Sequence, residues 1–226
     1  MKPCQALPVG ASIIEGVWEQ IIHYPQGETL RPALFLDRDG AVLVETHYLC
    51  EAAKAALIPG AAQVIKRANE RGIATVLITN QAGIGLGYFD WDAFIDVQEC
   101  MLDQLAAAGA ALDGVFACPF HAKGEPPCRH PDHPARKPNP GMLLRAAEQL
   151  NIDLAASWII GDRQSDLAAG KNAAIEGGQH VLTGHGGSEG EQASALALDG
   201  DGFRALPAAS IADALDLIPM LKARRD

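Results

Sequence analysis

Short apolar runs alternate with helical patterns along most of the chain. The runs lie at 33–37, 73–79, 114–118, 157–161 and 179–183, and the segments between them have helical spacing. This alternation is typical of βαβ units, in which parallel strands form a sheet and the intervening helices cover it. We therefore predict an α/β protein with a parallel sheet flanked by helices.

Capping residues give the expected helix limits. Asp90 is a suitable N-cap, Gly72 and Gly109 are typical stop signals, and Pro140 is tolerated in a first helical turn. These signals predict helices over 60–71, 91–108, 139–150, 165–175 and 210–223. The Gly-rich stretch 184–202 is expected to be a mobile loop region.

The first 31 residues precede the first core strand. Their apolar residues are spaced like those of a short packing helix, so we interpret 1–31 as an extension that covers the core. Residues 32–226 are then expected to form a single domain.

Composition excludes several classes of protein. A net charge of -10 argues against nucleic-acid binding, because phosphate backbones are bound by clustered Lys and Arg. We find neither an apolar run of membrane-spanning length nor a signal peptide. The five cysteines are odd in number and scattered, which suits a reducing compartment. We expect a cytoplasmic protein with no membrane partner.

Two carboxylates, Asp37 and Asp39, follow the first apolar run at i and i+2. Ligands bind beyond the carboxyl ends of parallel strands, and an extended backbone would place both side chains on one side. Gly40 then lets the chain turn without crowding a ligand. Taken alone, the pair could equally be a solvated loop after an ordinary strand.

Polar residues at the ends of later runs favour a site. A hydroxyl and two amides follow the second run, two carboxylates follow the fourth, and two cations lie between them: Thr79, Asn80 and Gln81; Asp162 and Asp166; Arg136 and Lys137. Hydroxyls, amides and cations can all bind phosphate oxygens. Each group alone is weak, but the set in this order indicates phosphate chemistry.

With these residues the chain resembles the haloacid dehalogenase (HAD) superfamily of phosphotransferases, over roughly residues 33–185. Residues 36–40, 79–84, 87–89 and 136–142 are similar to one branch, which contains heptose bisphosphate phosphatases and histidinol phosphatases. The four motifs of the superfamily stand in order as Asp37-x-Asp39, Thr79, Lys137 and Gly161-Asp162-x-x-x-Asp166.

The resemblance implies a Rossmann-like HAD fold and a role for each motif. Asp37 would be the nucleophile that forms an aspartyl-phosphate, and Asp39 the general acid and base. Thr79 and Lys137 would bind the transferring phosphoryl oxygens. Mg²⁺ would be bound by Asp37, the backbone carbonyl of Asp39 and Asp162, with Asp166 orienting these ligands. Asn80, Gln81, Arg136 and His47 are further candidates for substrate binding.

Cysteines and histidines gather in the loop 118–136. Cys118 and His121 form a C-x-x-H pair, and Cys128 is followed by His130 and His133. Structural zinc sites take four such ligands from short loops, so we expect a structural Zn²⁺ bound by Cys118, His121, Cys128 and either later histidine. The pattern departs from the branch, since Phe120 stands where a His is usual. The alternative is a loop without metal.

Other departures concern the substrate. The branch usually has Thr, Asn and Arg where this chain has Ala41, Leu43 and Leu86. Loss of the Arg removes a possible phosphate contact, although Arg136 could replace it. The spacing between motifs leaves no room for a large cap domain. The site is therefore expected to be open, with a rim drawn from His47, Tyr48, Glu51, Phe89 and the loop 118–136.

We expect a monomeric, Mg²⁺-dependent phosphomonoesterase. The leading substrate is a small sugar bisphosphate, D,D-heptose 1,7-bisphosphate, cleaved at its 7-phosphate. The first alternative is histidinol-phosphate phosphatase. The second is a catalytically poor protein that binds phosphosugars or is stabilised by zinc for interaction with a partner.

Overall fold

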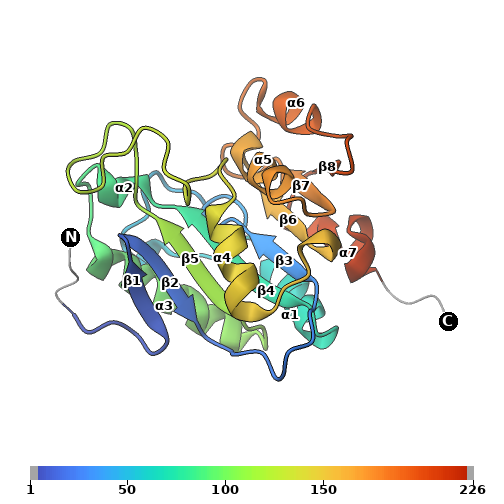
Figure 1. Ribbon diagram of the computed structural model, residues 1–226, viewed down its shortest axis with the longest axis horizontal. Helices are drawn as coiled ribbons and strands as arrows, with labels where there is room; N and C mark the ends of the chain where they lie inside the picture. The colour runs from blue at the N-terminus through green and yellow to red at the C-terminus, as the bar shows by residue number, and fades with distance from the viewer. Residues whose placement is uncertain (1–4, 223–226) are drawn as a thin grey trace.

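The computed structural model describes residues 5–222, and its centre is an eight-stranded sheet (Figure 1). The strand order is β1-β2-β5-β4-β3-β6-β7-β8, and the six strands from β5 to β8 run parallel. The strands are β1 Ala11–Ile14, β2 Val17–Ile21, β3 Ala33–Leu36, β4 Ala74–Asn80, β5 Gly114–Cys118, β6 Trp158–Gly161, β7 Gly177–Val181 and β8 Arg204–Ala208.

Helices cover both faces of the sheet, as the α/β prediction requires. The α-helices are α1 Ala61–Glu70, α2 Ala82–Gly85, α3 Trp91–Ala107, α4 Gly141–Leu150, α5 Gln164–Asn172, α6 Glu191–Leu196 and α7 Ala214–Leu217. Short 3₁₀ turns are η1 Ala52–Lys54, η2 Leu154–Ala156, η3 Ile211–Asp213 and η4 Pro219–Leu221. The expected C-terminal helix 210–223 is therefore broken into η3, α7 and η4.

The core has two halves, one on each face of the sheet. Leu34 and Leu36 of β3 pack with α1, α3 and α7, whereas Ala33 and Phe35 pack with α4 and α5. Figure 1 shows α4 in front of the sheet and α3 behind it. Because successive side chains of a strand point to opposite faces, a strand buried on both faces is apolar throughout.

The N-terminal segment forms a hairpin, so the predicted packing helix is wrong. Glu15 and Gly16 have φ values of 52° and 83°, which suits a two-residue turn between antiparallel strands. β2 then pairs antiparallel with β5, with Trp18 opposite Ala117. The hairpin thus extends the main sheet at the exposed edge of β5.

The Gly-rich stretch also has more structure than predicted. It contains α6, and β8 follows it to complete the sheet. β7 begins at Gly177, two residues before the predicted 179. A Cβ at Gly177 would lie 2.8 Å from the Trp158 ring, so the strand needs a residue without a side chain there. Glycine is a poor strand signal, which explains the missed start.

No large cap is inserted in the part of the chain that the structure describes. Between Asp39 and Thr79 the chain forms η1, α1 and most of β4. Likewise, none of the helices between residues 5 and 222 has the length and apolarity that a membrane span needs.

Candidate active site

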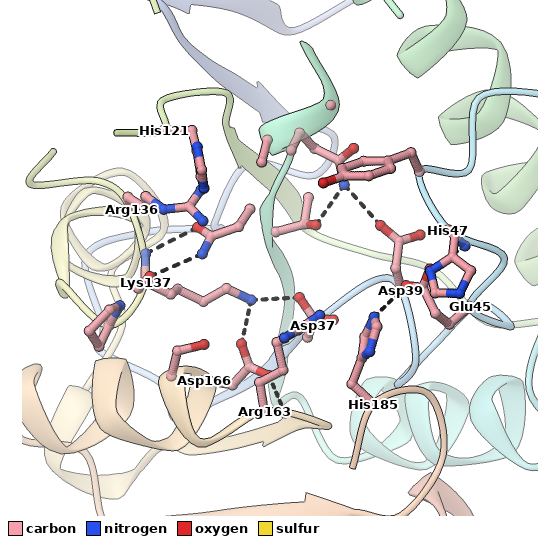
Figure 2. A pocket seen from close by; sticks show the side chains of 18 residues that line it. Asp37, Asp39, Glu45, His47, His121, Arg136, Lys137, Arg163, Asp166 and His185 are labelled. Atoms are coloured by element: carbon pink, nitrogen blue, oxygen red, sulfur yellow. Dashed lines mark hydrogen bonds and ion pairs between the residues drawn. The ribbon is translucent and has the colours of Figure 1, made fainter. Parts of the chain in front are cut away.

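A pocket of about 550 Å³ lies beyond the carboxyl ends of β3, β4 and β6. Figure 2 shows its lining side chains, which converge from segments far apart in the sequence. The parallel arrangement explains this convergence, since all these strands end at the same edge of the sheet. The motif residues Asp37, Asp39, Thr79, Lys137 and Asp166 all line the pocket.

Lys137 joins two carboxylates in the buried floor of this pocket. Its Nζ lies 2.5 Å from Asp37 Oδ1 and 2.7 Å from Asp166 Oδ1, and it donates to the carbonyl of Ile78 at 2.9 Å. Burial acts to lower the pKa of Lys137, but the two carboxylates raise it above its usual value. The lysine is therefore a fixed positive charge.

Asp37 directly follows β3, and its amide donates to the carbonyl of Ile160 in β6 at 2.9 Å. Burial raises the pKa of Asp37 well above its usual value, and Lys137 opposes that shift. A buried carboxylate beside a cation is suited to attack an electrophile, because water does not shield it and the cation opposes the protonation that burial favours.

Asp39 is fixed by a buried arginine that the sequence analysis missed. Arg38 is fully buried, and its Nε donates to both Asp39 oxygens at 3.0 and 3.1 Å. Gln81 Nε2 donates to Asp39 Oδ2 at 2.9 Å and to Thr79 Oγ1 at 2.8 Å. Gln81 thus positions Asp39 and Thr79. An arginine after a strand usually lies in solvent, so its type and place alone did not indicate this role.

Three carboxylates could bind a divalent cation. Oxygens of Asp37, Asp162 and Asp166 all lie within 4.8 Å of one another. Burial, and then the charge of Asp166, raise the pKa of Asp162 to about 7. Mg²⁺ prefers carboxylate oxygens, and a cation would relieve the repulsion among these groups. The residues therefore fit Mg²⁺.

Two of the predicted substrate-binding residues have structural contacts. Asn80 exchanges hydrogen bonds with the backbone of Lys137, through Nδ2 to the carbonyl at 3.0 Å and from the amide to Oδ1 at 3.1 Å. Arg136 donates from Nη1 to the carbonyl of Phe120 at 2.8 Å. Both side chains also line the pocket, as does Arg163, which sequence reasoning missed.

Only some of the residues predicted for the rim of the site line the pocket. His47, Tyr48 and His121 line the pocket, whereas Glu51 and Phe89 are not among its lining residues. Instead, Glu51 forms an ion pair with Lys54 at 2.6 Å. The unusual residues Ala41 and Leu43 are fully buried in the core, so they pack the fold and do not line the pocket.

The Cys/His loop does not form a zinc site as arranged. Cys118 Sγ lies 4.0 Å from His133 Nδ1, but no three Cys or His ligand atoms of this loop gather within 4.8 Å in the described chain. His133 stacks on Phe120, with ring centroids 3.8 Å apart. Burial raises the pKa of Cys118 to about 11, which favours a neutral thiol. The four predicted ligands would have to move to bind zinc.

A family model and named relatives match this chain. The model of the haloacid dehalogenase-like hydrolases matches residues 13–174. A relative from Mesorhizobium japonicum, named D-glycero-beta-D-manno-heptose-1,7-bisphosphate 7-phosphatase, is 45% identical over 163 residues, which cover 72% of this chain and 75% of the relative.

Solved structures give the same result. A crystal structure from Mesorhizobium loti, described as a HAD-like phosphatase, is 38% identical with a TM-score of 0.79, covering 92% of this chain and 96% of that one. A D,D-heptose 1,7-bisphosphate phosphatase from B. bronchiseptica, solved with magnesium and phosphate, is 29% identical with a TM-score of 0.66, covering 82% and 96%. The chain belongs to the haloacid dehalogenase-like hydrolase family.

Proposed function

We propose that this protein is a Mg²⁺-dependent phosphomonoesterase. The observation that supports it most is the buried Asp37–Lys137–Asp166 cluster beside Asp39. An Asp37 oxygen attacks phosphorus, and the bond from phosphorus to the leaving alkoxide breaks while Asp39 protonates that alkoxide. Asp39 then takes a proton from water, and the water oxygen displaces Asp37 from phosphorus.

Other residues fix the reacting groups. Thr79 and Lys137 would bind the phosphoryl oxygens, and Lys137 would offset the charge that develops on them. Asp37, Asp162 and the backbone carbonyl of Asp39 would bind the metal, and Asp166 would orient these ligands. Asp166 is itself held by an ion pair with Lys137 and by a hydrogen bond from the Arg163 amide at 2.9 Å. When bound, Mg²⁺ supplies positive charge that lets carboxylates and phosphate approach.

The substrate that we propose is D,D-heptose 1,7-bisphosphate, with loss of the 7-phosphate. The names of the relatives support this choice. So do Arg136 and Arg163, two pocket cations that would attract a substrate with two phosphates. Histidinol phosphate has no second phosphate, and its other end carries a positively charged amine, so the two arginines do not favour it.

Phosphate release tests the proposal. Purified protein with Mg²⁺ should hydrolyse the heptose bisphosphate with a higher kcat/KM than histidinol phosphate or an aryl phosphate. Asp37→Asn should abolish turnover on all of them with an unchanged circular dichroism spectrum. Phosphate release by that variant would refute Asp37 as nucleophile. Absence of turnover by the wild type on every substrate would favour a binding protein.

The remaining expectations stay proposals. A monomer predicts a single species near 23.8 kDa in sedimentation, and a cytoplasmic location predicts that the protein fractionates with soluble cell contents. Zinc in the loop 118–136 would require a rearrangement of Cys118, His121, Cys128 and a later histidine. Metal analysis after exhaustive dialysis tests it, and zinc well below one ion per chain would favour the metal-free loop.

A further inference from the structure

We propose that Glu45, His47 and His185 form a second metal site, for a transition-metal ion such as Zn²⁺, at the rim of the pocket. There the ion would bind the non-reacting phosphate of the substrate. The metal site is inferred from side-chain geometry alone, whereas its role toward substrate rests on the proposed function.

The three side chains converge from two segments far apart in the sequence, Glu45 and His47 from one and His185 from the other (Figure 2). One ligand atom of each lies within 4.8 Å of the other two. Glu45 Oε1 accepts a hydrogen bond from the backbone N–H of His47 at 2.5 Å, and Glu45 Oε2 lies 3.9 Å from His185 Nε2. The ring centroids of the two histidines are 5.9 Å apart.

The distance between the Glu45 and His185 ligand atoms suits a bridging ion better than a direct hydrogen bond. At 3.9 Å, Oε2 and Nε2 are too far apart for a hydrogen bond. Two ligands of one tetrahedral metal are roughly 3.4 Å apart, so a small side-chain movement would close the site. Two imidazoles and one carboxylate favour Zn²⁺, Co²⁺ or Ni²⁺, whereas Mg²⁺ prefers oxygen ligands only.

The backbone that carries His185 is fixed to the catalytic centre. The His185 amide donates to Asp162 Oδ2 at 2.7 Å, and Thr183 Oγ1 donates to the carbonyl of Gly40 at 2.5 Å. A Cβ at Gly184 would lie 2.3 Å from Asp162 Oδ2 and 2.6 Å from Gly40 Cα, which shows how closely this segment is packed. A ligand on so rigid a segment needs little ordering to bind an ion.

The place of the cluster suggests its task. Glu45, His47 and His185 line the same pocket as Asp37 and Lys137. Without an ion, the Glu45 carboxylate would repel a second phosphate that entered the pocket. A bound divalent cation reverses that local charge, and its open coordination position would accept a phosphate oxygen.

Cobalt is the probe for the site, because its visible spectrum reports the ligands. Protein saturated with Mg²⁺, so that the carboxylate cluster is occupied, is titrated with Co²⁺. We expect visible bands typical of nitrogen and oxygen ligands, without the near-ultraviolet band that Cys thiolates of the loop 118–136 would produce. His47→Gln and His185→Gln should each weaken this binding at least about tenfold.

His23→Gln is the matched control, since its ring contacts the carbonyl of Leu112 at 2.9 Å and is absent from the pocket lining. It should bind Co²⁺ as the wild type does. Equal Co²⁺ affinity in the wild type and in both rim variants would overturn the site, and so would a spectrum of thiolate ligands alone.

Kinetics test the role toward substrate. With Mg²⁺ and Zn²⁺ present, His185→Gln should raise KM for the heptose bisphosphate by a larger factor than KM for an aryl phosphate. Equal factors would overturn the role while the cobalt spectra still decide the site. Loss of all turnover in the wild type would instead refute the proposed function, and the cobalt result would be unaffected.

Discussion

At the scale of single residues, Arg38 is the strongest candidate for a positioning residue. It is fully buried, and its Nε donates to both oxygens of Asp39. Its Cζ lies over the Phe94 ring, 5.2 Å from the ring centroid. Arg38→Lys keeps the charge but loses the planar donor pair. We expect kcat to fall about 100-fold, because Asp39 would be misplaced for proton transfer. KM should change little, because the Asp39 side chain does not bind the substrate.

Steady-state kinetics and thermal unfolding check this prediction together. The control is Arg67→Lys on α1, where the guanidinium makes a surface ion pair with Glu70 at 3.7 Å. That variant should keep the wild-type kcat. If Arg38→Lys lowered the melting temperature strongly and left kcat unchanged, Arg38 would be a structural residue only.

The site residues that lie next to predicted strands and helices could be identified from the sequence. Residues that position other side chains could not. Asp37, Lys137 and Asp162 follow apolar runs or precede a helix, so βαβ geometry brings them together. Arg38 was missed because a buried cation cannot be told from a solvated one by its place in the sequence. His185 was missed because its contact with Asp162 depends on the path of the loop after β7.

At the scale of secondary-structure elements, the β1–β2 hairpin is anchored by Trp18. Its ring lies 5.6 Å from that of Trp91 and 5.3 Å from that of Phe94, both on α3. Trp18→Ala should lower the free energy of unfolding by about 3–5 kcal/mol, because it leaves a cavity between the hairpin and α3. Trp18→Phe keeps most of the packing and should cost less.

Urea denaturation measures both variants, with Val9→Ala as the control because Val9 is 96% exposed. A loss below about 1 kcal/mol for Trp18→Ala would mean that the hairpin is not anchored by this side chain. Hairpin formation could not be read from the sequence, since the spacing of Ile13, Val17 and Ile21 fits a helix as well. Pairing with the edge of β5 decided the outcome.

The segment after β7 gives a second prediction for an element. Gly184 has φ +59° and its added Cβ would meet Asp162 Oδ2 at 2.3 Å, whereas Gly190 has φ +78° and nothing within 4 Å. Gly190→Ala should cost only about 1 kcal/mol of stability from backbone strain. Gly184→Ala should cost more and should also raise the Mg²⁺ concentration needed for half-maximal activity. Equal effects of the two substitutions would contradict the packing of this segment on Asp162.

At the scale of the whole molecule, the fold brings like charges together at the edge of its sheet. Burial raises the pKa values of Asp37 and Asp162, which means that the folded chain disfavours their ionised forms. The two halves of the core, on either face of the sheet, supply the stability that offsets the cost of burying these carboxylates close together. The active site is therefore expected to destabilise the metal-free protein.

Asp162→Asn tests this balance between stability and function. The Asn side chain removes one repulsive charge. Its oxygen can still accept the hydrogen bond that the backbone N–H of His185 donates to Asp162 Oδ2 at 2.7 Å. Without Mg²⁺ the variant should therefore melt at a higher temperature than the wild type, although it should lose most of its activity. Mg²⁺ at about 100 times its Kd should stabilise the wild type by about 2.7 kcal/mol and the variant much less. Differential scanning calorimetry with and without Mg²⁺ measures both effects. A metal-free variant that melts below the wild type would show that the attraction between Asp162 and its neighbours outweighs the repulsion among the carboxylates.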